Sequence, residues 1–129
     1  AQHRIVRLAA DGRLRGGFGR FGLRGDGFNY PSAVLRAGDG TLLVADTGNR
    51  RIGRYSAQGA HLGTLAQFDF MPKRMALAGT TLAVHDAIGA RLHYVRVDGG
   101  AAQGTARLPA GIGLGLVSAA GPRQFVASI

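Results

Sequence analysis

The side chains that could carry chemistry in this sequence are seven aspartates and four histidines, because the chain contains neither Glu nor Cys. His85 and Asp86 form the only adjacent His–Asp pair, and His3, His61 and His93 share no spacing with it. A catalytic metal or an acid–base pair needs imidazoles and carboxylates that converge. The absence of Cys excludes disulfides and thiolate metal sites. We therefore predict no catalytic residues, no metal site and no cofactor, and a non-enzymatic protein.

A Gly-rich stretch, GFGRFGLRG at 17–25, could be interpreted as a phosphate-binding loop. It lacks the G-x-x-x-x-G-K-[ST] spacing of such loops, and no helical pattern follows it. We therefore interpret it as a connection between strands.

The charge is strongly positive, with fifteen Arg and one Lys against seven Asp, for a formal net charge of +9. Such a balance favours RNA or another polyanion, an anionic surface or an acidic protein as partner. Arg richness is also typical of genomes with high G+C content, so the sequence alone leaves open whether it is functional or compositional.

At 129 residues the chain has the length of one ordinary domain. Its longest apolar runs fall well short of the roughly 20 residues that cross a bilayer, so we expect no transmembrane segment. The sequence starts Ala1-Gln2-His3-Arg4 without a Met, which fits either a processed exported protein or a piece of a longer chain. Its location stays unassigned, with an extracytoplasmic compartment slightly favoured.

An internal repeat organises the elements that must position these residues. PSAVLRAGDGTLLVAD at 31–46 aligns with MPKRMALAGTTLAVHD at 71–86, and each contains a short strand, a Gly turn and a second strand that ends in Asp. Five residues later comes Arg51-Ile52 or Arg91-Leu92, at the start of a third strand, and a short fourth strand follows. Four strands in a period of about 40 residues are typical of propeller blades.

This pattern resembles the NHL repeat. The match is specific at 28–65 and degraded at 69–108, where Gly89 replaces Asn49. The resemblance implies an all-β fold, a β-propeller of four-stranded antiparallel blades, usually six of them, with terminal half-blades at both chain ends.

We divide the chain into 1–27, the third and fourth strands of a split blade with a connection; 28–65, a blade; 66–108, a second blade; and 109–129, the first and second strands of a split blade. Because unpaired strand edges are unfavourable, we expect completion from outside. Two arrangements remain open: a homodimer that closes a six-bladed ring, or a longer chain or larger complex.

The stretch LVADTGNRRI at 43–52 is predicted to form the corner between the second and third strands. Asp46 should accept hydrogen bonds from N–H groups of the following turn. Gly48 and Asn49 should supply positive φ angles. Arg51 should reach back to Asp46 or to the Asp of a neighbouring blade. The structural corner set is Asp46, Asn49, Arg51, Asp86 and Arg91.

In a propeller these corners and the connections between blades lie on one face, where Arg and aromatic side chains alternate in this sequence. Our candidate partner-binding residues are Arg20, Phe21, Arg24, Arg50, Lys73 and Arg74. We expect the aromatic residues near the Pro of each connection, Phe28, Tyr30 and Phe70, to pack between blades rather than contact a partner.

The sequence thus predicts a non-enzymatic scaffold for protein–protein interaction or assembly through this face. One alternative is binding of RNA or another polyanion, whose affinity should fall steeply with salt. A second alternative is a metal-dependent lyase or lactonase-like enzyme, since some propellers line their channel with carboxylates and histidines.

Overall fold

The computed structural model describes residues 2–98, 102–107, 117–121 and 124–127. Its elements are strands and one short 3-10 helix: β1 (Ile5–Leu8), β2 (Leu14–Phe18), β3 (Pro31–Arg36), β4 (Leu42–Asp46), η1 (Thr47–Asn49), β5 (Arg51–Tyr55), β6 (His61–Gln67), β7 (Met75–Ala78), β8 (Thr81–Asp86), β9 (Arg91–Arg96), β10 (Ala102–Arg107), β11 (Val117–Gly121) and β12 (Gln124–Ala127). No helix in these ranges is long and apolar enough to cross a membrane.

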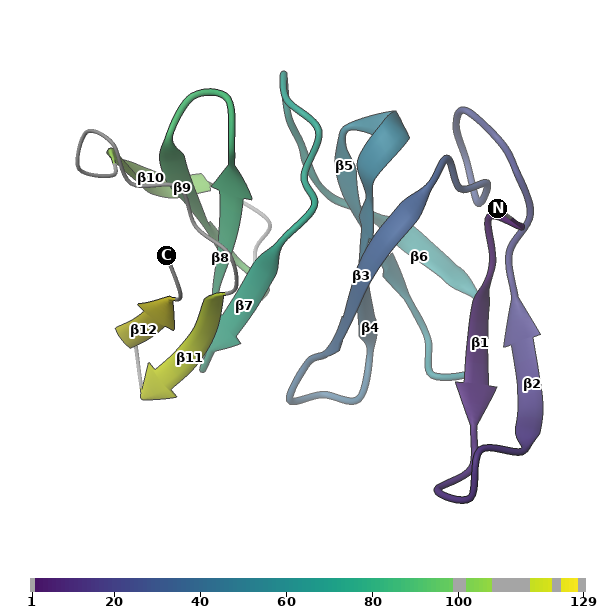
Figure 1. Ribbon diagram of the computed structural model, residues 1–129. Coiled ribbons are helices and arrows are strands. Elements are labelled where there is room, and N and C mark those ends of the chain that lie inside the picture. Colours follow the sequence, from purple (N-terminus) through teal and green to yellow (C-terminus); the bar gives the residue numbers. More distant parts are fainter. Residues whose placement is uncertain (1, 99–101, 108–116, 122–123, 128–129) are drawn as a thin grey trace.

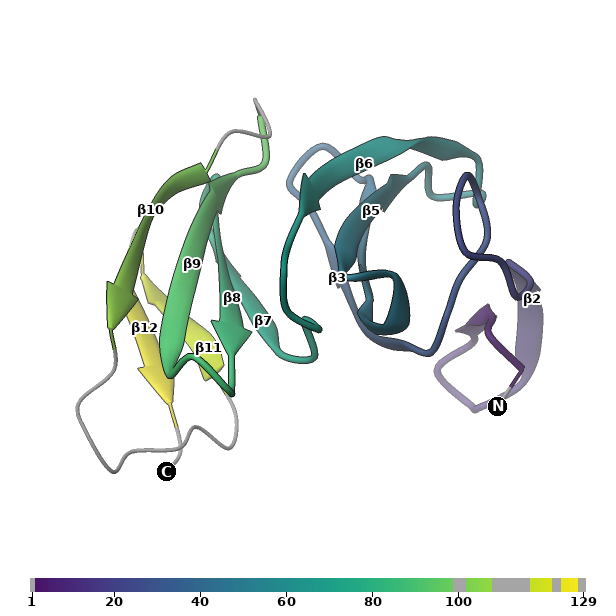
Figure 2. The ribbon, with the colours of Figure 1, turned by 90° about the horizontal axis from the view of Figure 1, so that it is seen from above.

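The strands form antiparallel sheets of two, four, four and two strands in chain order: β1–β2, β3–β6, β7–β10 and β11–β12. The sheets stand side by side, with β1–β2 at one end of the row and β11–β12 at the other (Figures 1 and 2). The first strand of the second large sheet, β7, contacts both β3 and β11. The prediction of an all-β fold with four-stranded antiparallel sheets is confirmed.

The central strands of the large sheets are covered on both faces. Leu43, Val44 and Ala45 in β4 are all buried, whereas β3, at the sheet edge, alternates between half-buried and exposed residues. A near-continuous apolar run suits a strand that is packed on both sides, and alternation suits one with a solvated face.

The core lies in layers between neighbouring sheets. Leu43, Ala45 and Ile52 of the first large sheet pack with Leu82 and Val84 of the second. A smaller cluster of Phe28, Val44 and Tyr55 receives Phe18 from β2, so it joins the first large sheet to the N-terminal hairpin. The first large sheet therefore buries apolar residues against a neighbour on each side.

The loops gather at the two ends of these sheets. Figure 1 shows the β4–β5 and β8–β9 corners together with the β2–β3 and β6–β7 connections along the upper edge, and the β1–β2, β3–β4 and β5–β6 turns along the lower edge. The predicted boundary between 66–108 and 109–129 falls at residues 108–116, which lie outside the described residues.

Candidate functional site: a loop-built basic face

The corner at residues 46–51 is built around the buried carboxylate of Asp46. Its Oδ1 accepts the backbone N–H of Asn29 at 2.7 Å. Its Oδ2 accepts Asn49 Nδ2 at 2.8 Å and Arg51 Nε at 2.9 Å. Asp46 and Arg51 face each other in the β4–β5 ladder, so strand pairing holds the two charges together. A buried charge needs such pairing, because desolvation otherwise disfavours it.

The remaining donors of this corner hold the connection that precedes β3. Arg51 Nη2 donates to the carbonyls of Gly25 at 2.9 Å and Gly27 at 2.6 Å, and Asn49 Nδ2 donates to Gly22 at 2.8 Å. That loop is also closed on itself, since the Gly22 N–H donates to the Phe28 carbonyl. The corner therefore fixes residues 22–29 in one conformation.

The same corner holds the connection that follows β6. Thr47 Oγ1 donates to the Pro72 carbonyl at 2.7 Å, and Arg50 Nη1 donates to the Asp69 carbonyl at 3.1 Å. The backbone N–H of Phe68 donates to the Arg50 carbonyl. Residues 46–51 thus clamp one connection on each side of the first large sheet.

Two details of the predicted corner are wrong. Arg50, with φ +57°, takes the left-handed conformation, and neither Gly48 nor Asn49 does. Gly48 is needed for space instead, because a Cβ there would come within 2.5 Å of the Asn29 side chain. The backbone N–H that Asp46 accepts comes from Asn29 in the preceding connection, not from the turn that follows. The predicted reach of Arg51 to Asp46 is confirmed.

The second corner has the same backbone but a weaker side-chain network. Asp86 faces Arg91 in the β8–β9 ladder, and Ala90 has φ +52°. Asp86 Oδ1 accepts the backbone N–H of Gly89 at 2.9 Å, and its Oδ2 lies 3.9 Å from His93 Nε2. Arg91 is exposed. Gly89 has no side-chain amide like that of Asn49, so its backbone N–H donates to the aspartate of this corner instead.

The aromatic residues of the connections divide into two groups. Phe28 and Phe70 are buried, as predicted. Tyr30 is 61% exposed, so its assignment to the core is wrong. The cause is its left-handed backbone, φ +53°, which turns the ring outward against His3, with ring centroids 4.5 Å apart. Phe21 packs on the same imidazole, with centroids 5.0 Å apart.

We call the surface formed by residues 17–30, 46–51, 68–74 and 86–90 the basic face. All six candidate partner-binding residues belong to it and are exposed: Arg20, Phe21, Arg24, Arg50, Lys73 and Arg74. They do not form one cluster. The first three belong to the loop clamped by Arg51, Arg50 belongs to the corner, and Lys73 and Arg74 lie in the connection beyond it.

A pocket of about 290 Å³ opens on the basic face beside the second corner. The β6–β7 connection contributes Phe70, Met71, Lys73 and Arg74, and the end of β8 and the corner contribute His85, Asp86, Ala87 and Ile88. Met71 is 47% exposed and Ile88 is 93% exposed. The lining thus combines apolar side chains with two cations, Lys73 and Arg74, and one carboxylate, Asp86.

His85 lies at this pocket, where the aligned residue of the first sheet is Ala45. Its side chain is buried. Burial lowers the pKa of His85 below its ordinary value, the Asp86 carboxylate opposes that shift, and the Arg74 cation adds to it. The pocket therefore presents a neutral imidazole near neutral pH.

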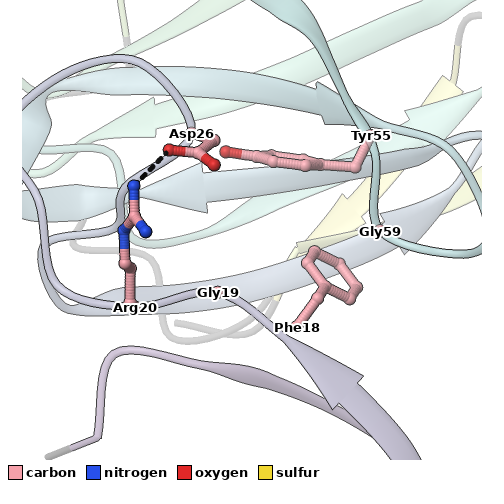
Figure 3. Close-up of a pocket in the computed structure, with 6 residues that line it drawn as sticks. All are labelled: Phe18, Gly19, Arg20, Asp26, Tyr55 and Gly59. Carbon is pink, nitrogen blue, oxygen red and sulfur yellow. Dashed lines mark hydrogen bonds and ion pairs between the residues drawn. The ribbon is translucent and has the colours of Figure 1, made fainter.

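A second pocket, of about 250 Å³, lies between the N-terminal hairpin and the first large sheet (Figure 3). Phe18 and Tyr55 supply its aromatic walls, and Arg20 Nη2 lies 3.5 Å from Asp26 Oδ1 at its edge. The Tyr55 hydroxyl is buried and has no hydrogen-bond partner among the described residues. Burial raises the pKa of Tyr55 to about 12, with Arg51 opposing the shift and Asp46 and Asp26 adding to it.

His93 approaches one carboxylate, that of Asp86, but in the described part of the chain no histidine belongs to a larger group of possible metal ligands. Among the described residues, no three His, Cys, Asp or Glu side chains come together as a metal ion requires. His93 packs against Phe70, with ring centroids 4.6 Å apart, and its buried Nε2 has no hydrogen bond to any residue that the structure describes. His61 packs against Tyr55. These imidazoles belong to the packing between strands.

Sequence reasoning missed the apolar part of the basic face. It selected five cations and Phe21, whereas Leu23, Met71 and Ile88 are also exposed there. Ile88 carried a signal that could have been used, because it stands in the corner where the first copy has Gly48. A large apolar residue in a turn that otherwise takes small or polar residues indicates a contact surface.

Comparison with known proteins supports the fold. No family model matches the sequence, and no curated protein matches it. Virginiamycin B lyase from Staphylococcus aureus has a similar structure, with a TM-score of 0.68 and 20% identity, over 92% of this chain and 40% of that chain. The structure of a catalytically inactive histidine-to-alanine variant of this lyase, with quinupristin, matches with a TM-score of 0.68 and 14% identity. The match covers 91% of this chain and 39% of that chain.

Hydrazine synthase from Kuenenia stuttgartiensis is a more distant match, with a TM-score of 0.59 and 16% identity, over 68% of this chain and 25% of that chain. The lyase is a β-propeller, so the predicted propeller fold is confirmed. The chain spans about 40% of the length of the lyase. Identities this low show the fold alone.

Proposed function

We propose that this chain is an NHL-type propeller segment whose basic face binds an acidic and partly apolar segment of a protein partner. The NHL assignment rests on the sequence pattern at 28–65, with its Asp46, Asn49 and Arg51 corner. The binding function rests on one observation above all, the pocket at the second corner.

The size and lining of that pocket favour a single inserted side chain. Its volume of about 290 Å³ lies just below the range of ligand pockets, about 300 to 1,000 Å³. Phe70, Met71 and Ile88 offer apolar contacts to an inserted side chain. Partner side chains that fill such pockets are usually the ones whose truncation costs the most binding free energy. Lys73 and Arg74 also line the pocket, and their two positive charges exceed the one negative charge of Asp86, which favours a partner with carboxylates beside its apolar anchor.

The rigidity of the connections supports binding. Because residues 46–51 hold the loops on both sides of the first sheet, the exposed side chains on these loops need little further ordering when a partner binds. Preorganised loops on a rigid scaffold are typical of binding surfaces.

Two other functions receive less support. For RNA, the exposed aromatic rings would have to stack on bases, but Phe21 and Tyr30 both pack against His3. For an enzyme, the printed name of the lyase suggests catalysis, but the likeness is one of fold, and the described residues offer no convergent metal ligands. Binding of a protein partner needs only the pocket at the second corner, with its apolar side chains and two cations.

Fluorescence anisotropy with a labelled 12-residue peptide that alternates Glu with Leu and Phe would test the proposal. We expect binding that weakens at least tenfold in the Lys73→Glu, Arg74→Glu double variant. The matched control is Arg13→Glu, Arg36→Glu, which makes the same change of charge just before β2 and at the last residue of β3, outside the basic face, and should bind like the parent.

A second peptide, with Ser in place of every Leu and Phe, separates apolar anchoring from charge attraction. Equal binding of both peptides would overturn the proposal. So would tighter binding of a 20-residue oligouridine, with log affinity falling by about 0.7 per contacted phosphate for each log unit of salt. That result would establish polyanion binding instead.

A further inference from the structure

The pocket between the N-terminal hairpin and the first large sheet contains a polar group that the protein leaves unpaired. Tyr55 is 1% exposed, and its hydroxyl has no hydrogen bond to any residue that the structure describes. Burial of a hydroxyl without a hydrogen bond is unfavourable, so buried polar groups usually have a partner. A ligand in this pocket would supply that partner.

Two opposite charges lie at the edge of the same pocket. Arg20 Nη2 lies 3.5 Å from Asp26 Oδ1, and the two side chains are 79% and 62% exposed. An exposed ion pair contributes little free energy, because water screens the charges. Figure 3 shows the Tyr55 hydroxyl pointing toward Asp26, with Arg20 on the other side of that carboxylate. Both charged groups can therefore pair with a ligand instead of with each other.

The aromatic wall of the pocket is fixed by its neighbours. The rings of Phe18 and Tyr55 have centroids 5.5 Å apart, and both rings pack on Phe28. A Cβ at Gly59 would overlap the Phe18 ring, so this ring lies directly on the backbone of the β5–β6 turn. The apolar wall is thus formed before a ligand binds, as is usual in small-molecule sites.

The volume of the pocket limits the ligand to a small molecule. At about 250 Å³ it equals the space of about eight water molecules, which occupy about 30 Å³ each in the liquid. A compound with about that many non-hydrogen atoms therefore fits, and valine and proline have this size. A nucleotide or a peptide segment exceeds it.

We infer that the pocket binds a small zwitterion with an apolar side chain, of the class of the free aliphatic amino acids. A ligand with one charge would pair with Arg20 or Asp26 and be repelled by the other, whereas a zwitterion pairs with both. The site uses neither Lys73 nor Arg74, so it stands or falls independently of the proposed function.

Each group of such a ligand has a counterpart in the pocket. The ligand carboxylate would accept from the guanidinium of Arg20, and the ammonium group would donate to the carboxylate of Asp26. Burial raises the pKa of Tyr55 to about 12, so its hydroxyl is neutral at pH 7 and can also accept from the ammonium group. The apolar side chain of the ligand would pack on Phe18.

A nuclear magnetic resonance titration of the isotope-labelled chain with L-valine tests the inference. We expect saturable shifts of the backbone amides of Gly19, Asp26 and Gly59, and none at residues 86–90 of the second corner. Two analogues separate the charges, since 3-methylbutanoate lacks the ammonium group and 2-methylpropylamine lacks the carboxylate. Each should bind at least about tenfold more weakly than L-valine, because charge-assisted hydrogen bonds are lost. No shift at about 20 mM L-valine, or equal binding of either analogue, would overturn the inference.

Single substitutions test the two polar groups that face the ammonium group. Tyr55→Phe keeps the aromatic ring and should weaken binding of L-valine at least about tenfold, and Asp26→Asn should do the same. Asp11→Asn is the matched control, because Asp11 also forms an exposed ion pair with an arginine, at 3.0 Å, but lies between β1 and β2. This control should bind L-valine like the parent. Undiminished binding by Tyr55→Phe would overturn the role of the hydroxyl, and equal losses in Asp26→Asn and Asp11→Asn would overturn the site.

Discussion

Arg51 and Asp46 form a buried ion pair across the β4–β5 corner, with Arg51 Nε 2.9 Å from Asp46 Oδ2. Both side chains also form hydrogen bonds with other residues. Asp46 also accepts from Asn29 and Asn49, and Arg51 also donates to two carbonyls of the preceding loop. The pair therefore couples the sheet to the loop that carries Arg20 and Arg24 on the basic face.

The first prediction concerns the removal of this charge. Asp46→Asn leaves the Arg51 guanidinium buried without its counter-charge, which typically costs about 3 to 5 kcal/mol. We expect a loss of unfolding free energy in that range, measured by urea denaturation with circular dichroism.

Asp86→Asn is the matched control, because Asp86 occupies the same corner in the second sheet but faces an exposed Arg91. Asp86→Asn should lower the free energy of unfolding by no more than about 1 kcal/mol, because it weakens the hydrogen bond that the Gly89 N–H donates to this side chain. Equal losses in the two variants would contradict the special role of the first corner.

The second prediction concerns space at the same corner. In Gly48→Ala the new methyl group would meet Asn29 atoms at 2.5 to 2.8 Å, so the loop that the corner holds must shift. Overpacking of this kind costs about 1 to 3 kcal/mol. Gly38→Ala, where nothing lies within 4 Å of the added Cβ, should leave the urea midpoint unchanged or slightly raised. A neutral Gly48→Ala variant would show that the loop accommodates the methyl group without strain.

The fold was predictable from the sequence because it repeats. Two copies of one strand pattern, each closed by an Asp and an Arg five residues later, indicate the same strands and the same corner. The φ angles of the corner were not predictable by residue type, because the left-handed position falls on Arg50 and Ala90, two residues with no preference for it. Backbone closure between strands decides that position, not side-chain propensity.

The candidate site was predictable only in its charged part. Exposed cations in the connections could be selected by their place in the repeat, but the outward turn of Tyr30 and the pocket lined by Met71 and Ile88 depend on how two loops from different repeats meet. Such contacts join residues distant in sequence, and one sequence without an alignment carries no signal for them.

The third prediction is a pH dependence of stability that arises from His85. Because burial lowers the pKa of His85 in the folded chain, the unfolded chain takes up a proton first as the pH falls through the ordinary value of 6.5. Folding is then opposed, so stability should decrease between pH 7 and pH 5. His85→Ala, which restores the residue found at position 45, should have a shallower decrease. Urea midpoints at the two pH values measure the difference, and parallel curves for parent and variant would contradict the prediction.

The last prediction concerns Tyr55, whose hydroxyl is buried without a hydrogen-bond partner in the part of the chain that the structure describes. Since burial raises its pKa from 10.0 to about 12, the folded chain holds the neutral phenol, whereas the unfolded chain ionises above pH 10. This contribution to stability is complete below pH 10 and is lost as the pH rises toward 12.

In an absorbance titration of phenolate formation, the parent should therefore show a component near pH 12 that is missing from Tyr55→Phe. The same variant should be at least as stable as the parent at neutral pH, because it removes an unsatisfied polar group and keeps the ring that packs on Phe18 and Phe28. Tyr55→Ala, which also removes the ring, should cost about 3 to 5 kcal/mol. A loss above about 1 kcal/mol in Tyr55→Phe would mean that the hydroxyl has a hydrogen-bond partner in solution.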